Sequence, residues 1–162
     1  MLTHPDNSSK SFTVRDRLLE IQPSVKQWGI SDREGIVHRL DKQTSGLIVC
    51  ALNEDIFKLL QTFFKERTIY KEYVCIVEGK LRTQSGNIEV PLSRSRHNRI
   101  KREVSGEGRI SSSNFEVLLE GNTYSKLKIE LLTGRNHQIR SQMEFLGNPI
   151  VNDILYLSLI HI

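Results

Sequence analysis

The chain has 162 residues, of which 26% are charged, and its lysines and arginines exceed its acidic residues by four. This length favours one domain with a sizeable core, so we expect residues 1–162 to form a single domain. No apolar run approaches the length of a membrane-spanning helix, and the first residues lack the apolar stretch of a secretory signal. We therefore expect no membrane partner, whereas the modest positive charge is compatible with nucleic acid.

The two cysteines, Cys50 and Cys75, lie in apolar runs without the spacing of a metal site or a CxxC motif. This pattern favours buried free thiols in a reducing compartment, so we expect a cytoplasmic protein. We also expect a monomer.

The polar residues 1–11 are expected to be mobile, and residues 12–22 to form a short helix that ends before Pro23. Residues 23–34 are expected to form a loop in which Trp28 packs on the core; stacking on a base is the less favoured alternative.

In residues 35–51, two short apolar runs flank a polar loop from His38 to Gly46. Runs of this kind predict two strands that meet at a loop, the usual place for functional side chains. Asp41 lies between Arg39 and Lys42, which favours an ionised carboxylate. Taken alone, an aspartate before Thr-Ser-Gly is more commonly a turn residue.

Asn53 predicts a helix N-cap, and apolar residues at helical spacing, including Phe63 and Phe64 as core residues, extend the helix to Arg67. Residues 69–78 alternate as in a strand, with Tyr73 and Tyr70 on opposite faces.

Residues 88–92 predict a strand that ends at a basic loop, residues 94–102, and residues 105–109 predict a turn. Residues 115–119 and 124–132 predict paired strands, and residues 136–146 a helix stopped by Gly147 and Pro149. The expected fold is α+β, with a mixed, mostly antiparallel sheet and flanking helices.

Three stretches resemble the signatures of one family, the RluA-type RNA pseudouridine synthases. The first is His-Arg-Leu-Asp-Lys-Gln-Thr-Ser-Gly-Leu at residues 38–47, the second Lys-Glu-Tyr at 71–73, and the third Thr-Gly-Arg-Asn-His-Gln-Ile-Arg at 133–140. They occur in the family's order, and the resemblance covers roughly residues 33–156. It implies the pseudouridine-synthase fold and an isomerase that converts specific uridines of ribosomal or transfer RNA without a cofactor.

The resemblance also implies roles for individual residues. Asp41 matches the catalytic nucleophile, Tyr73 the tyrosine that stacks on uracil and takes the C5 proton, and Arg140 the cation that pairs with the aspartate. Arg39 matches an arginine that fills the gap left by the flipped nucleotide or holds its phosphate.

Further residues are expected to contact RNA or to shape the cleft. They are His38, Arg135, His137, Arg96, Arg99 and Arg102. The histidines lack the spacing of a metal site, so we expect no metal. Two departures from the family pattern are Ser141-Gln142, where Val-His is usual, and Asn152, where glycine is usual.

Residues 157–162 form an atypical tail, and strands present in the family are missing at both ends, which predicts a truncated catalytic domain. An alternative is a non-catalytic RNA-binding remnant of such an enzyme. A hydrolase with paired carboxylates is a third, less favoured reading, because neither main motif contains a second acidic residue.

Overall fold

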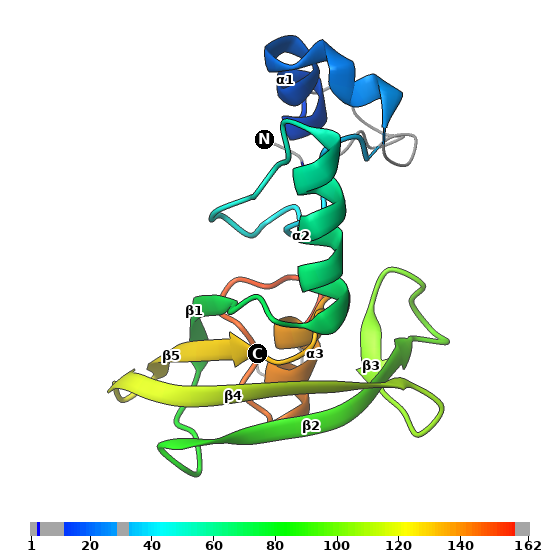
Figure 1. Cartoon of the computed structure of the whole chain (residues 1–162). Helices are drawn as coiled ribbons and strands as arrows, with labels where there is room; N and C mark the ends of the chain where they lie inside the picture. Colours follow the sequence, from blue (N-terminus) through cyan, green and yellow to red (C-terminus); the bar gives the residue numbers. More distant parts are fainter. Residues whose placement is uncertain (1–2, 4–11, 29–32, 158–162) are drawn as a thin grey trace. The chain divides into compact units, whose positions relative to one another are not determined.

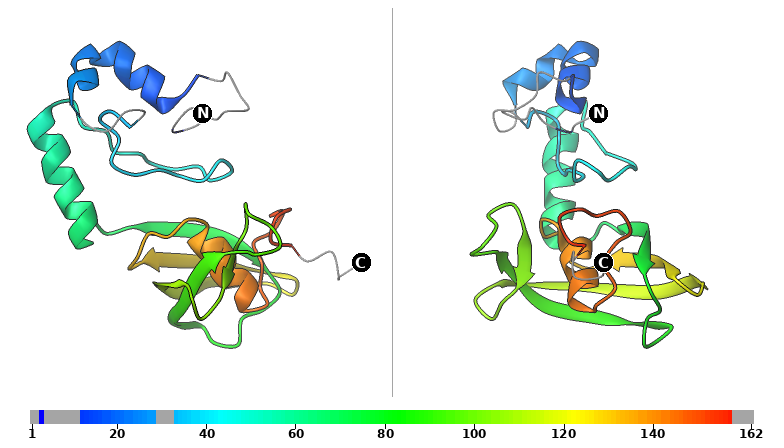
Figure 2. Two further views of the ribbon diagram at one scale, coloured as in Figure 1. Left: turned by 90° about the vertical axis from the view of Figure 1, so that its right-hand side faces the viewer. Right: turned by 180° about the vertical axis from the view of Figure 1, so that it is seen from behind.

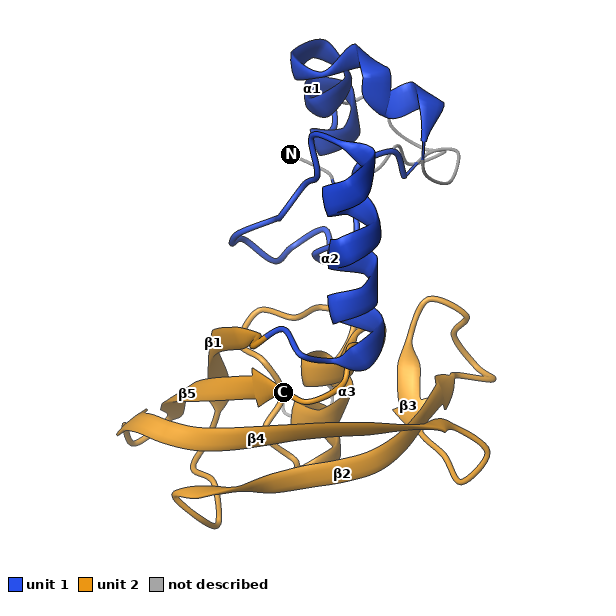
Figure 3. Ribbon diagram, viewed as in Figure 1, with its two compact units in different colours: residues 1–69 blue, residues 70–162 orange. Residues whose placement is uncertain are grey.

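The computed structural model describes residue 3, residues 12–28 and residues 33–157. The chain divides into two compact units, residues 1–69 and residues 70–162 (Figure 3). The expectation of a single domain stays a prediction. The expected mobility of residues 1–11 and the atypical tail fall almost wholly outside the described residues.

The first described helix of unit 1 is α1 (Val14–Ile21), as predicted. Thr13 caps it reciprocally, since its side chain accepts a hydrogen bond from the N–H of Asp16 while its own N–H donates to the Asp16 carboxylate. A 3₁₀ turn, η1 (Pro23–Gln27), follows. Trp28 packs against Phe57, with the ring centroids 5.3 Å apart, which confirms its packing role.

Helix α2 (Glu54–Glu66) is capped by Asn53, whose side-chain oxygen accepts a hydrogen bond from the N–H of Ile56 at 2.9 Å. Phe57 is its buried residue. Phe63 is 38% exposed, so the expectation that it is a core residue is wrong, whereas Phe64 is half-buried. The apolar spacing identified the helix correctly but overestimated how much of its face is covered.

The two strands predicted around the polar loop do not form. The described residues 35–51 contain one isolated antiparallel bridge, between Ile36 and Cys50. Leu47 is 91% exposed. A two-stranded ribbon without a further strand or a covered apolar face is only marginally stable, which explains the single bridge.

Unit 2 contains a five-stranded sheet in the order β1-β5-β4-β2-β3, and every neighbouring pair is antiparallel (Figure 1). The antiparallel sheet confirms the expected α+β class. Its strands are β1 (Glu72–Glu78), β2 (Ser85–Arg94), β3 (Arg102–Val104), β4 (Arg109–Glu120) and β5 (Tyr124–Leu131).

Helix α3 (Gln138–Phe145) lies against one face of this sheet (Figure 2). Met143 of the helix packs with Val77, Leu127 and Ile129, all fully buried. Tyr73 joins this core from the same face of β1, as its alternation predicted. The helix thus holds the residues at its N-terminal end in a fixed position beside the sheet.

Three strands differ from their predictions. β2 and β4 extend beyond the expected ranges, and β3 forms where no strand was predicted, beginning at the last residue of the predicted basic loop. Most of the extra residues are polar or charged, so they carry little apolar alternation for a sequence pattern to detect. Among the described residues, no helix has the length and apolar character needed to cross a membrane.

Gln142, one of the departures from the family pattern, is a polar residue of the core. Its side chain has no exposed surface, accepts a hydrogen bond from Ser113 at 2.5 Å and donates to the carbonyl of Ile88 at 3.2 Å. It also donates to Ser111. Gln142 therefore joins α3 to β2 and β4.

The substitution Gln142→Leu should destabilise unit 2 by about 2 kcal/mol or more, because it leaves buried hydrogen-bonding groups without partners. Amide hydrogen exchange of Leu127 and Ile129 measures this loss. The exposed Gln84→Leu serves as the control and should have little effect. Equal exchange in the two variants would contradict the anchoring role.

Candidate functional site

The loop that carries Asp41 belongs to unit 1 and is closed at its base. The N–H of Ala51 donates to the carbonyl of Gly35 at 2.8 Å, beside the Ile36–Cys50 bridge. Gly35 has a φ of 69°, and a Cβ there would lie 2.6 Å from the side chain of Leu18. Only glycine fits this position, so the base of the loop depends on it.

Asp41 itself starts a turn, since its carbonyl accepts a hydrogen bond from the N–H of Thr44 at 2.9 Å. Its side chain is half-buried, whereas Arg39 is exposed. Asp41 can therefore be a turn residue and a catalytic residue at once. The turn uses its backbone carbonyl, and its side-chain carboxylate makes separate contacts.

His38 ties the two arms of this loop together. Its Nε2 accepts a hydrogen bond from the N–H of Val49 at 2.9 Å, and its ring stacks on Phe64 at 4.9 Å. In the neutral imidazole this places the proton on Nδ1. His38 therefore positions the loop, whereas its expected role in shaping the site for RNA stays a prediction.

In unit 2, Tyr73 lies on the inner face of β1, half-buried against the core. Tyr70 precedes the strand, is 64% exposed and hydrogen-bonds through its hydroxyl to Glu72 at 2.6 Å. The two tyrosines thus occupy different environments, as their positions in the alternating pattern predicted.

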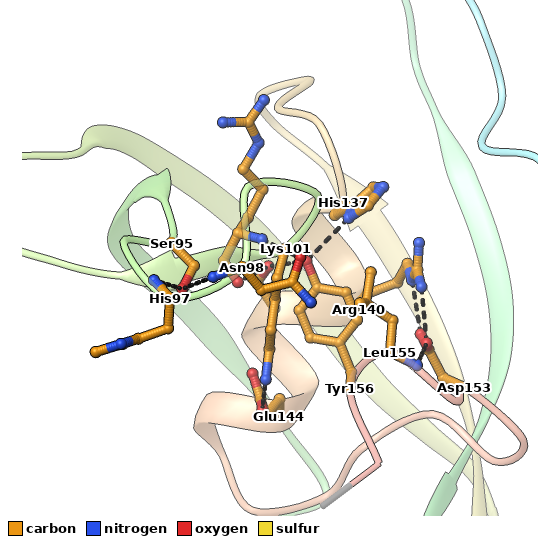
Figure 4. Close-up of polar contacts among 12 residues, drawn as sticks. Ser95, His97, Asn98, Lys101, His137, Arg140, Glu144, Asp153, Leu155 and Tyr156 are labelled. Atoms are coloured by element: carbon orange, nitrogen blue, oxygen red, sulfur yellow. Dashed lines mark hydrogen bonds and ion pairs between the residues drawn. The ribbon is translucent and has the colours of Figure 1, made fainter. Parts of the chain in front are cut away.

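Arg140 forms a bidentate ion pair with Asp153. Its Nε lies 2.6 Å from Oδ2 and its Nη2 2.7 Å from Oδ1 (Figure 4). The guanidinium also lies over the ring of Tyr156, 4.7 Å from the centroid. Both contacts fix its orientation. The pairing of Arg140 with Asp41 that the resemblance implies stays a prediction.

The hydroxyl of Tyr156 joins three segments of unit 2. It accepts a hydrogen bond from the N–H of Arg102 at 2.8 Å and lies 3.0 Å from Nδ1 of His137 and 3.1 Å from the hydroxyl of Ser141 (Figure 4). Its ring has a second cation beside it, Lys101, which pairs with Glu144. Tyr156 therefore holds the start of β3, the start of α3 and the C-terminal segment together.

Burial and nearby charge change the pKa of two groups in this cluster. Burial by itself raises the pKa of Asp153, but the hydrogen bonds and charge of Arg140 and two backbone N–H groups outweigh it, so the net pKa lies below the ordinary value. Burial also raises the pKa of Tyr156. The Arg140–Asp153 pair therefore stays charged at neutral pH.

The turn before α3 is built by two residues of the third motif. Gln138 is buried, and its side-chain oxygen accepts hydrogen bonds from the hydroxyl of Thr133 at 2.7 Å and from the N–H of Arg135 at 2.9 Å. His137, the residue before Gln138, has a φ of 55°. The motif therefore contains structural residues as well as the candidate functional arginine.

The basic loop between β2 and β3 has a defined base and an exposed tip. The N–H of Ser95 donates to the carbonyl of Lys101 at 3.1 Å, and the Ser95 hydroxyl caps two N–H groups of the loop. Arg96 pairs with Glu107 at 3.0 Å, but both side chains are 79% exposed, so the pair contributes little stability. Arg99 is exposed and Arg102 half-buried.

Sequence reasoning missed Asp153 and Tyr156 as partners of Arg140. Both lie within the stretch, roughly residues 33–156, that resembles the family, but a resemblance does not reveal which side chains pair. The structure also gives Asn152 a φ of 62°, a backbone region that asparagine tolerates better than most residues. This explains how asparagine replaces the usual glycine.

Both cysteines are free thiols and half-buried, less than the burial expected. Burial raises the pKa of Cys75 to about 12, so its thiol is protonated and unreactive at neutral pH. Among the described residues, no group of three or more histidine, cysteine or acidic side chains is arranged to hold a metal ion.

The variant Asp153→Asn should destabilise unit 2 at neutral pH by about 3 kcal/mol, because it removes the charge of a buried carboxylate that pairs with a largely buried guanidinium. A carboxylate with a lowered folded-state pKa stabilises the fold above the unfolded-state value of about 3.9, and this contribution disappears as the pH falls through the folded-state pKa. The difference between wild type and variant should therefore shrink below about pH 4. Amide exchange in β5 measures it, with the exposed Glu89→Gln as control, and a difference constant with pH would contradict the pairing.

Comparisons with known proteins place these residues in a family. The family model described as RNA pseudouridylate synthase matches residues 9–145. Ribosomal large subunit pseudouridine synthase D of Borreliella burgdorferi is 38% identical over 159 residues, which are 96% of this chain and 49% of that protein. The protein of the same name from Blochmanniella floridana is 36% identical over 156 residues, 96% of this chain and 48% of the relative.

A solved structure supports the same assignment. Human RNA Pseudouridylate Synthase Domain Containing 1 superposes with a TM-score of 0.76 at 28% identity, over 91% of this chain and 61% of that one. The chain spans about half the length of the curated relatives it matches. The family match includes all three motifs and most of both units, so the chain belongs to the RNA pseudouridylate synthase family, as its resemblance to the RluA type predicted.

Proposed function

We propose that the chain carries the catalytic part of an RNA pseudouridine synthase that isomerises uridines in ribosomal RNA. The observation that carries this proposal is the family match across the Asp41 motif, together with relatives named for the large ribosomal subunit. Transfer RNA is the second substrate class. The proposal covers the activity of the whole protein, of which these residues are a part.

The reaction breaks the N1–C1′ glycosidic bond, turns the uracil and rejoins it through C5. It involves no net hydrolysis and no redox change, so it requires no cofactor. It does require a nucleophile near C1′ or the ring, and a carboxylate is suited to this role. Asp41 is that nucleophile in our proposal, and its turn on a loop with a defined base supports it.

Tyr73 and Arg140 complete the proposed chemistry. Tyr73 stacks on the uracil and takes the C5 proton, a role compatible with its half-buried position on a rigid strand. Arg140 stabilises the carboxylate of Asp41. Its bidentate pair with Asp153 and its contact with Tyr156 support this role, because a positioned guanidinium loses little freedom when it binds an anion.

The substrate base must leave the RNA stack before any side chain can reach it, at a cost of a few kcal/mol. In our proposal Arg39, which is exposed, fills the gap left by the flipped nucleotide or holds its phosphate. Arg96, Arg99, Arg102 and Arg135 contact the RNA backbone, and His38 and His137 shape the site. We further propose a monomer that acts in the cytoplasm, where ribosomal RNA is modified.

A non-catalytic remnant is the alternative, and it is not favoured. All three proposed catalytic residues, Asp41, Tyr73 and Arg140, are retained within the part of the chain that the family model matches. A remnant under no pressure to react would have no physical reason to keep this combination.

The variant Asp41→Asn should abolish release of tritium from RNA that carries 5-tritiated uridine, because an amide is a poor nucleophile. Binding of the same RNA should persist. Asp55→Asn, on the exposed first turn of α2, is the matched control and should retain turnover. Turnover by Asp41→Asn above background would remove Asp41 as the nucleophile.

The variant Tyr73→Phe keeps the ring but loses the hydroxyl, so it should lower kcat by about 10²- to 10⁴-fold while KM changes little. Tyr70→Phe makes the same chemical change at an exposed position outside the proposed site. Single-turnover tritium release compares the two. Equal rates in both variants would exclude Tyr73 from proton transfer.

A further inference from the structure

A basic concavity lies at one end of the sheet in unit 2. Its volume is about 440 Å³, and four arginines line it, Arg94, Arg102, Arg109 and Arg135, with Glu107 as its acidic residue. We call this site the arginine pocket. Three of the arginines come from three neighbouring strands, β2, β3 and β4, and the fourth from the turn before α3.

The strand register brings these charges together at an energetic cost. Arg94 and Arg102 lie directly opposite each other across the β2–β3 pair, an arrangement that destabilises a sheet when the charges are alike. Within the described ranges, none of Arg94, Arg102 and Arg109 forms an ion pair with a carboxylate. A bound anion would remove the repulsion.

The turn between β3 and β4, which lines the pocket, packs closely on β2. A Cβ on Gly108 would lie 2.5 Å from the carbonyl carbon of Leu92, so only glycine allows the β3–β4 turn to pack on the backbone of β2. The N–H of Ser105 in this turn donates to the carbonyl of Pro91 at 3.0 Å. These contacts set Arg109 beside β2, opposite Leu92.

The fourth arginine is also held in place. Nε of Arg135 donates to the carbonyl of Ile110 at 3.1 Å, and its backbone N–H donates to the buried side chain of Gln138. Glu107, meanwhile, pairs with Arg96 outside the set of four. The pocket therefore has a surplus of guanidinium groups.

The chemistry of the lining defines the ligand. Guanidinium groups match the geometry of phosphate oxygens and keep their charge at any physiological pH. The described lining residues include no aromatic ring on which a base could stack. Another concavity of unit 2, of about 510 Å³, includes Glu116 and Glu130 and is less suited to an anion.

We propose that the arginine pocket binds phosphodiester groups of the RNA backbone, independently of base sequence. This inference rests on the proposed function for the identity of the nucleic acid. It assigns the main phosphate contacts to Arg94, the first residue of the predicted basic loop, and to Arg109, which lies outside that loop, together with Arg102 and Arg135. It gives Arg96 a lesser role, because that residue already has an acidic partner.

The double variant Arg94→Gln/Arg109→Gln tests the pocket. Filter binding of a ribosomal RNA fragment between 50 and 300 mM salt gives the slope of log K against log salt, which should flatten by about 1 to 2 as two phosphate contacts are lost. The matched control is Arg82→Gln/Lys126→Gln, which removes the same charge from exposed positions away from the pocket. Equal slopes in the two double variants would overturn the inference.

A variant that should strengthen RNA binding completes the test, because damage to the fold would not produce this result. Glu107→Gln removes the pocket's acidic residue and releases Arg96, so it should strengthen RNA binding severalfold. Unchanged or weaker binding would count against the pocket.

Tritium release by the wild-type chain separates this inference from the proposed function. Release together with equal slopes would overturn the pocket alone. A flattened slope without release would support the pocket and count against the proposed reaction, and a wild type that binds no RNA would overturn both.

Discussion

The structure of unit 2 depends on the burial of one face of an antiparallel sheet beneath a single helix. Met143 provides the apolar contact, and Gln142 on the same helix bonds to β2 and β4. Because these contacts fix both the height and the rotation of α3, they also fix the residues at its N-terminal end. Core contacts therefore set the positions of His137 and Arg140, although neither residue belongs to the core.

Around that helix, the polar residues form a connected cluster in which one tyrosine joins several elements. Tyr156 bonds to the backbone of Arg102 and to Ser141, and its ring lies beneath Arg140. Asp153 supplies the counter-charge. The same tyrosine that orients the candidate catalytic arginine therefore also anchors the start of β3, at Arg102, which lines the arginine pocket. Stability and the proposed function share these side chains.

Several features could be predicted from the sequence because each depends on local rules. The spacing of apolar residues located α2 and α3, the capping side chain of Asn53 marked a helix start, and alternation placed Tyr73 on the inner face of its strand. Where polar strands lack alternation, as in β3, the sequence carried no signal. Beside the Asp41 loop the apolar runs predicted two strands that do not form. Apolar runs do not show whether a partner strand exists.

The sequence by itself determined the family, the three motifs and the residue types that the proposed reaction needs, because these are properties of short stretches of chain. Only the tertiary structure decided that Asp153 and Tyr156 hold Arg140, that Gln142 is a core anchor, and that Arg94, Arg102, Arg109 and Arg135 surround one concavity. These residues are far apart along the chain. They meet through strand register and helix packing, which no local pattern encodes.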